Sequence, residues 1–151
     1  MDDVSRVIVP NAILLGEVTN FLNEGKDVIL MTKGSSMLPF IRGERDSVNL
    51  RKLDSLAVGD IVLAQVKEGV YVLHRVFSVD GDIVTLMGDG NLKGKEKCRR
   101  SDISGTVMEI LKDGGKVVDC RGRKAFAEAR IWRFLLPFRR YILALYRRIS
   151  L

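Results

Sequence analysis

The chain has 151 residues, 46% of them hydrophobic, so it can form one domain with a substantial core but not two ordinary ones. The net charge of +6 is unevenly distributed. The body, residues 1–120, has 16 Lys or Arg and 18 Asp or Glu, whereas the basic tail, residues 121–151, has nine Lys or Arg and a single acidic residue, Glu128. Cys98 and Cys120 give neither a disulfide framework nor the paired spacing of a metal site, so we expect no metal or organic cofactor and leave buried thiols and one bridge as alternatives.

The start of the body predicts a helix, a strand and a tight turn. Pro10 and Asn11 can open a helix over residues 12–23. Residues 27–32 form a short apolar run that is typical of a strand, and they lead into a turn rich in small residues at 34–39. The helix is expected to pack through Ile13, Leu14, Val18, Phe21 and Leu22.

The rest of the body predicts a mainly β fold. Runs rich in β-branched residues are separated by turns that contain Gly or Asp, which favours a mostly antiparallel, barrel-like or coiled sheet. Alternation along the third of these runs places His74 on one face with neighbouring valines. Residues 88–100, rich in glycine and basic side chains, are expected to form a solvated, mobile loop. The expected strands are residues 47–50, 60–66, 70–77, 82–87, 105–111 and 116–120.

Three polar residues of the body have the chemistry that acyl transfer requires. Ser36 offers a hydroxyl just after a glycine-containing turn, His74 is the single histidine, and Asp89 is a carboxylate in a glycine-rich turn. These are a nucleophile, a base and an orienting group. Each taken alone is more commonly structural, as a turn serine, a core histidine or a turn carboxylate. Asp102 is the alternative orienting carboxylate.

The order and context of these residues resemble the signal peptidase I-like serine peptidases of the archaeal and endoplasmic-reticulum branch, over residues 34–107. The resemblance implies a coiled, barrel-like antiparallel β catalytic core with an N-terminal helix, which SOS-repressor-like peptidases share. It assigns Ser36 as nucleophile, His74 as base and Asp89 as orienting group, and it implies cleavage of a signal or leader peptide. The matching segments are Gly34-Ser35-Ser36-Met37-Leu38-Pro39, Leu73-His74-Arg75-Val76, Gly88-Asp89-Gly90-Asn91 and Ser101-Asp102-Ile103-Ser104-Gly105-Thr106-Val107.

The chain departs from the family in three respects. The bacterial branch has a lysine where this chain has His74, and neither Lys33 nor Lys67 occupies that place. Position 34 is glycine rather than an oxyanion-binding serine, so an oxyanion hole would rely on backbone amides such as that of Ser36. The family's N-terminal membrane anchor is missing from this sequence. A leader peptidase that acts on a cytoplasmic precursor fits that difference better than secretory processing does.

The basic tail predicts helices with a kink or break at Pro137. Its interleaved arginines, aromatics and aliphatics suit a helix at an anionic membrane interface, and the alternative is a helix packed on the body with its arginines in water. No nucleic-acid-binding motif is present, so no nucleic-acid partner is expected. The candidate membrane contacts are Arg130, Trp132, Arg133, Phe134, Arg139, Arg140, Tyr141, Arg147 and Arg148.

The sequence also predicts where the protein is located and what it does. The acidic Met1-Asp2-Asp3 start is not followed by an apolar run of signal-peptide form, and no uncharged apolar window reaches the length of a membrane span. We therefore expect a cytoplasmic or peripheral membrane protein. The function expected first is a serine endopeptidase with a polypeptide substrate, and the alternative is an inactive signal-peptidase-like interaction module that its tail recruits to a membrane.

Overall fold

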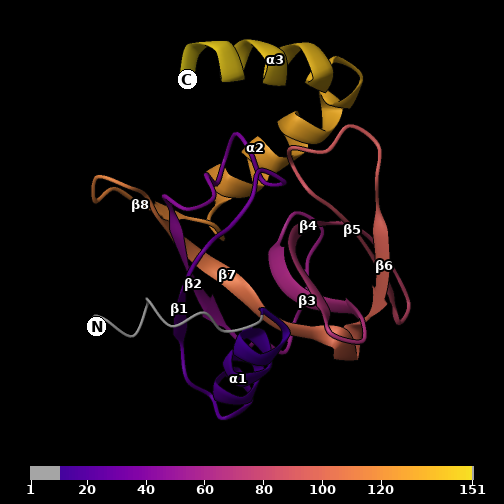
Figure 1. The fold of residues 1–151 in the computed structure, drawn as a ribbon. Coiled ribbons are helices and arrows are strands. Elements are labelled where there is room, and N and C mark those ends of the chain that lie inside the picture. Colours follow the sequence, from indigo (N-terminus) through magenta and orange to yellow (C-terminus); the bar gives the residue numbers. More distant parts are fainter. Residues whose placement is uncertain (1–10, 151) are drawn as a thin grey trace.

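The computed structural model describes residues 11–150 as a mainly β structure with helices at both ends (Figure 1). The expected roles of Met1-Asp2-Asp3 and Pro10 lie outside these residues. The elements in chain order are α1 (Asn11–Asn23), β1 (Val28–Met31), β2 (Ser47–Arg51), β3 (Ile61–Lys67), β4 (Val70–Asp80), β5 (Ile83–Met87), β6 (Glu96–Arg99), the short 3₁₀ turn η2 (Arg100–Asp102), β7 (Ile103–Leu111), β8 (Val117–Asp119), α2 (Arg123–Phe134), η3 (Leu136–Phe138) and α3 (Arg139–Ser150).

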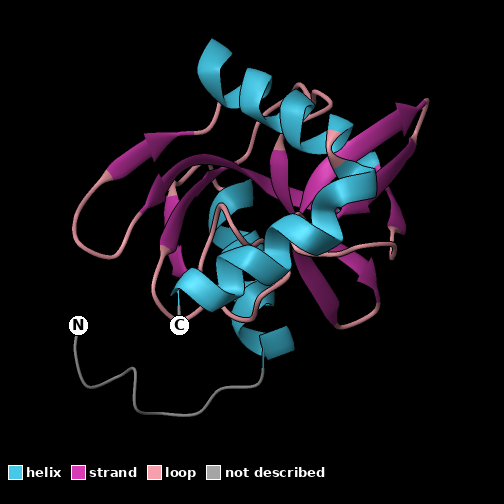
Figure 2. Ribbon diagram, turned by 90° about the horizontal axis from the view of Figure 1, so that it is seen from above, coloured by secondary structure: helices cyan, strands magenta, loops and turns pink. Residues whose placement is uncertain are grey.

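The strands form one antiparallel sheet in the order β1-β2-β7-β3-β4-β5-β6, and β8 adds to β7. The expected mostly antiparallel sheet is thus confirmed. It coils, so that β5 and β6 turn away from β1 and β2 (Figure 1). Seen from above, the two C-terminal helices lie over the strands (Figure 2). The break at Pro137 is also confirmed, because η3 separates α2 from α3.

Strand β3 explains how the core is divided. Its side chains alternate between two buried clusters: Ile61 and Leu63 belong to one, and Val62 and Ala64 to the other. A strand that is buried on both faces needs apolar residues at consecutive positions, which accounts for the run at 61–64. The second cluster also includes Val76 of β4, and Val72 of the same strand packs against it.

Helix α1 covers the first cluster, but through a narrower face than expected. Val18 and Leu22 are buried, whereas Ile13, Leu14 and Phe21 are 60%, 41% and 45% exposed, so the prediction that these last three pack against the core is wrong. Leu22 lies so close to the sheet that a Cβ on Gly105 of β7 would be 2.9 Å from its Cδ1. A glycine at this point of β7 therefore lets α1 approach closely.

The segment expected to be a solvated loop over residues 88–100 contains strand β6, so that expectation is wrong for Glu96–Arg99. It is also wrong for Gly88 and Asp89, which are buried. Strand β6 pairs with β5 and buries Cys98. Cys98 and Cys120 are both free and lie in different clusters, so the buried-thiol alternative is the one the structure has. Burial raises the pKa of the Cys98 thiol to about 11 and that of Cys120 to about 12.

A buried carboxylate closes the base of the segment that carries Ser36. Asp46 accepts hydrogen bonds from the Arg42 amide at 2.7 Å, from the Asp113 amide at 2.9 Å and from Lys112 Nζ at 2.8 Å. Burial alone would raise its pKa, but these donors lower the pKa of Asp46 from 3.8 to about 2. The Asp46 carbonyl also accepts from the Thr32 amide, so both ends of the segment are tied together.

Replacing Asp46 by Asn should lower the free energy of unfolding by about 2–4 kcal/mol, because an amide cannot accept from all three donors. Since the folded pKa lies below the ordinary value, the carboxylate adds stability that is complete above about pH 4 and is lost as the pH falls toward 2. Urea unfolding across this range should therefore show a weaker acid dependence for Asp46→Asn than for the wild type. Equal slopes would contradict the assignment.

Candidate functional site

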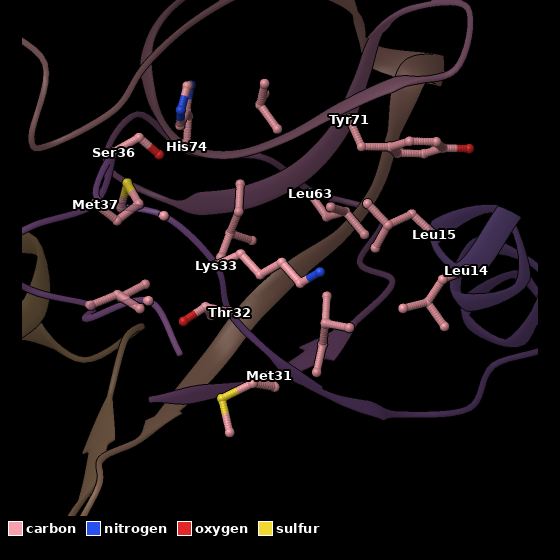
Figure 3. A pocket seen from close by; sticks show the side chains of 16 residues that line it. Leu14, Leu15, Met31, Thr32, Lys33, Ser36, Met37, Leu63, Tyr71 and His74 are labelled. Carbon is pink, nitrogen blue, oxygen red and sulfur yellow. The ribbon is translucent and has the colours of Figure 1, made fainter. Parts of the chain in front are cut away.

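A cavity of about 250 Å³ between α1, β1 and β4 contains both Ser36 and His74. In Figure 3 the side chains of Ser36 and His74 lie near each other on the same wall of this cavity. Within residues 11–150 no hydrogen bond joins the two side chains, a contact that in many enzymes tightens only with substrate. The remaining wall is largely apolar and includes Leu14, Leu15, Leu30, Met31, Ile41, Leu63 and Tyr71.

Close backbone packing shapes the turn that carries Ser36. Gly34 has a φ of 78°, in the region that favours glycine. A Cβ on Gly43 would lie 2.1 Å from the Gly34 carbonyl oxygen, so only glycine fits there as well. Met37, the residue after Ser36, is buried and anchors the turn in the core. The Ser36 amide donates to no acceptor among the described residues, so it is free to donate to a ligand.

The loop Gly88–Asn91 packs directly on this turn. The Gly90 amide donates to the Ser36 carbonyl at 2.8 Å. A Cβ on Gly88 would lie 2.4 Å from that same oxygen and 3.1 Å from Cδ2 of His74, and a Cβ on Gly90 would lie 2.4 Å from the Ser35 carbonyl oxygen. Both glycines are therefore needed for contact between the loop, the Ser36 turn and the imidazole.

A carboxylate holds His74, but it is not one that the sequence predicted. His74 is buried, and its Nδ1 lies 2.8 Å from Oε1 of Glu96 on β6. Because a carboxylate accepts, the imidazole donates from Nδ1, and this hydrogen bond leaves Nε2 without a proton in the neutral ring. A carboxylate at Nδ1 of a histidine is one of the contacts of a catalytic triad, and Ser36 lines the same cavity as that histidine.

Asp89 and Asp102 do not reach the imidazole. The Asp89 carboxylate is buried and accepts from Arg75 Nε at 2.9 Å and Nη2 at 2.6 Å. Burial alone would lower the pKa of the Arg75 guanidinium, but the charge and hydrogen bonds of Asp89 keep that pKa above its ordinary value. The physical reason is alternation: His74 and Arg75 point to opposite faces of β4, and Asp89 lies on the Arg75 side. Asp102 instead accepts from the Arg99 amide at 2.8 Å.

The tail reaches the same loop from the other side. Trp132 Nε1 donates to the Asp89 carbonyl at 2.9 Å, and Arg139 Nη1 donates to the Asn91 carbonyl at 3.0 Å. Trp132 also packs edge-on against Phe40, with ring centroids 5.8 Å apart. Trp132 and Arg139 are both buried, so they are wrong as membrane contacts. The other candidate contacts are exposed: Arg130, Arg133, Phe134, Arg140, Tyr141, Arg147 and Arg148.

Searches beyond the chain add no family assignment. No protein-family model and no curated protein matches the sequence. Among residues 11–150, no helix has both the length and the apolar character needed to cross a membrane. The same residues hold no group of three or more His, Cys, Asp or Glu side chains placed to share a metal ion.

The contact between the loop and the turn predicts a difference between two glycines. Gly90→Ala should lower the free energy of unfolding by about 1–3 kcal/mol, because its Cβ would meet backbone atoms that must move. Gly94→Ala is the matched control, since nothing lies within 4 Å of its Cβ. A thermal melt should show a loss of roughly 2–10 °C for the first variant and little change for the second. Equal melting temperatures would mean that the close approach does not exist.

Proposed function

We propose that this chain is a serine endopeptidase of the signal peptidase type, with a signal-peptidase-like core, that cleaves a signal or leader peptide. Ser36 is the nucleophile, His74 the general base and Glu96 the residue that positions His74. The observation that carries the proposal is the single histidine, bonded to a carboxylate through Nδ1 and sharing a cavity with Ser36.

The proposed reaction proceeds in two halves. The Ser36 hydroxyl attacks the scissile carbonyl carbon while its proton passes to Nε2 of His74, and Glu96 stabilises the resulting imidazolium. The oxyanion is held by the Ser36 amide. His74 then gives the proton to the leaving amine, which leaves an acyl ester on Ser36. Water, deprotonated by His74, attacks that ester and releases the new carboxyl terminus and the free serine.

The cavity supports a substrate with apolar side chains in extended form. Strand β1 is at the end of the sheet order, so one of its edges has no strand partner among the described residues, and it leads into the Ser36 turn. An extended peptide can pair with such an edge and place alternate side chains in the apolar cavity. The family resemblance implies small side chains before the cleaved bond, and a cavity of about 250 Å³ can hold them.

The nucleophile can be tested without knowledge of the natural substrate. A fluorophosphonate should label the wild type and Ser35→Ala at rates within about tenfold of each other, and it should not label Ser36→Ala. His74→Ala should slow labelling by about 10²–10⁴-fold, the usual contribution of a general base. Lys33→Met is the control, because Lys33 lines the same cavity and a serine–lysine pair would make this variant inert. Unlabelled wild-type protein would favour the inactive interaction module.

The positioning role separates Glu96 from Asp89. Glu96→Gln should slow labelling by about 10²–10⁴-fold with an almost unchanged melting temperature, because the wrong tautomer of His74 becomes accessible. Asp89→Asn should instead lower the free energy of unfolding by about 3–5 kcal/mol, since buried Arg75 loses its counter-ion. Asp102→Asn should change neither property. Slow labelling by folded Asp89→Asn together with fast labelling by Glu96→Gln would return the role to Asp89.

A further inference from the structure

A second, larger cavity lies between α2 and β4, on the Arg75 side of that strand. Its volume is about 420 Å³. Four arginines line it: Arg75, Arg130, Arg133 and Arg139. The one carboxylate among the lining residues is Asp89, and Arg75 already takes it at 2.6 Å. The cavity therefore has three positive charges beyond that ion pair and no acidic residue to balance them.

Arg139 shows that this excess charge extends into the interior. The residue is only 4% exposed, and its guanidinium donates to the carbonyl oxygens of Asn91 and Trp132. Its Nε is buried without an acceptor, and no carboxylate of residues 11–150 lies within ion-pair distance of it. Burial lowers the pKa of Arg139, as expected for a desolvated cation. A buried cation without a counter-ion is costly, so an anion in the cavity would stabilise this arrangement.

The same helices carry a stripe of exposed apolar side chains. Ile131 and Phe134 lie three residues apart on α2, and Tyr141, Leu145 and Ile149 recur every four residues on α3, a spacing that keeps residues on one side of each helix. Phe138 lies in η3 between the two helices. Phe134, one turn after Arg130, is 81% exposed. In Figure 1, α3 lies at the edge of the molecule, beyond α2 from the sheet. The stripe consists of Ile131, Phe134, Phe138, Tyr141, Leu145 and Ile149.

We propose that the arginine-lined cavity binds the phosphate of an anionic phospholipid headgroup, at a bilayer surface into which this apolar stripe inserts. A bilayer accounts for both features together: the stripe needs an apolar medium, and the arginines need anions. Arg130 and Arg133 belong to the cavity and lie beside the stripe, so one docked surface satisfies both. Glu128 is the single acidic residue of the tail, so little opposes an anionic surface. The proposal does not depend on the chemistry of Ser36.

Sedimentation of the full chain with vesicles tests the membrane part of the proposal. Vesicles that contain phosphatidylglycerol should bind at least about tenfold more tightly than phosphatidylcholine vesicles. Phe134→Ser should weaken binding to the anionic vesicles and leave a salt-sensitive remainder. Equal binding to both kinds of vesicle, or none to either, would overturn the proposal, and so would binding of the chain to an acidic peptide but not to vesicles.

Matched arginine variants test the cavity itself. Arg130→Gln with Arg133→Gln removes the same charge as Arg147→Gln with Arg148→Gln, whose arginines do not line the cavity. A headgroup site predicts about tenfold greater loss of vesicle binding for the first pair. Equal losses of vesicle binding would mean that the arginines act only through their charge, and they would overturn the proposed headgroup site. If the first pair unfolds, because Arg133 also stacks on Phe77, the single variants Arg130→Gln and Arg147→Gln make the same comparison.

Inorganic phosphate distinguishes the source of the anion. Phosphate alone should raise the melting temperature of the wild type more than that of the Arg130→Gln variant, because the cavity recognises the phosphate group. It should also compete with anionic vesicles for the chain. Stabilisation by phosphate without any vesicle binding would assign the cavity to a free phosphate compound and overturn the lipid.

Discussion

The buried ion pair between Arg75 and Asp89 is the contact on which the site depends. It fixes the loop that follows β5 against β4, and the glycines on either side of Asp89 then touch the Ser36 turn. Trp132 donates a hydrogen bond to the Asp89 carbonyl, so the tail also contacts the loop that carries Asp89. Asp89 is buried and Arg75 is only partly exposed, so each charge is costly without the other. Asp89, which the sequence motif predicts to be catalytic, therefore has a structural contact with Arg75 instead.

The carboxylate that contacts His74 comes from another strand. Glu96 reaches Nδ1 of His74 from β6, which closes the far end of the sheet, and it remains partly exposed to solvent. His74 and Arg75 are neighbours in the chain, yet they line two different cavities. Residues 71–74 of β4 line the cavity beside Ser36, and residues 75–77 line the arginine-lined cavity under α2. The candidate active site and the candidate lipid site therefore lie along successive parts of one strand.

The sequence predicted most strands because β-branched runs and Gly or Asp turns mark them. It also paired Ser36 with His74, and the two residues line one cavity. The sequence did not predict β6, since Glu-Lys-Cys-Arg has no β-branched residue and forms a strand only through pairing with β5. For the same reason it did not predict that Glu96 contacts His74. The tail pattern could not separate Trp132 from Phe134, because both sides of α2 carry large apolar residues. Only the packing of Trp132 on the Asp89 loop decides which side is buried.

The hydrogen bond to Glu96 fixes the tautomer of His74 in the structure. Because this is the single histidine of the chain, ¹⁵N-histidine NMR gives one set of ring signals. In the neutral ring we expect a protonated Nδ1 and an unprotonated Nε2, with the Nδ1 proton protected from solvent exchange in the wild type and exposed to it in Glu96→Gln. A ring protonated at Nε2, or spectra that Glu96→Gln leaves unchanged, would contradict this expectation.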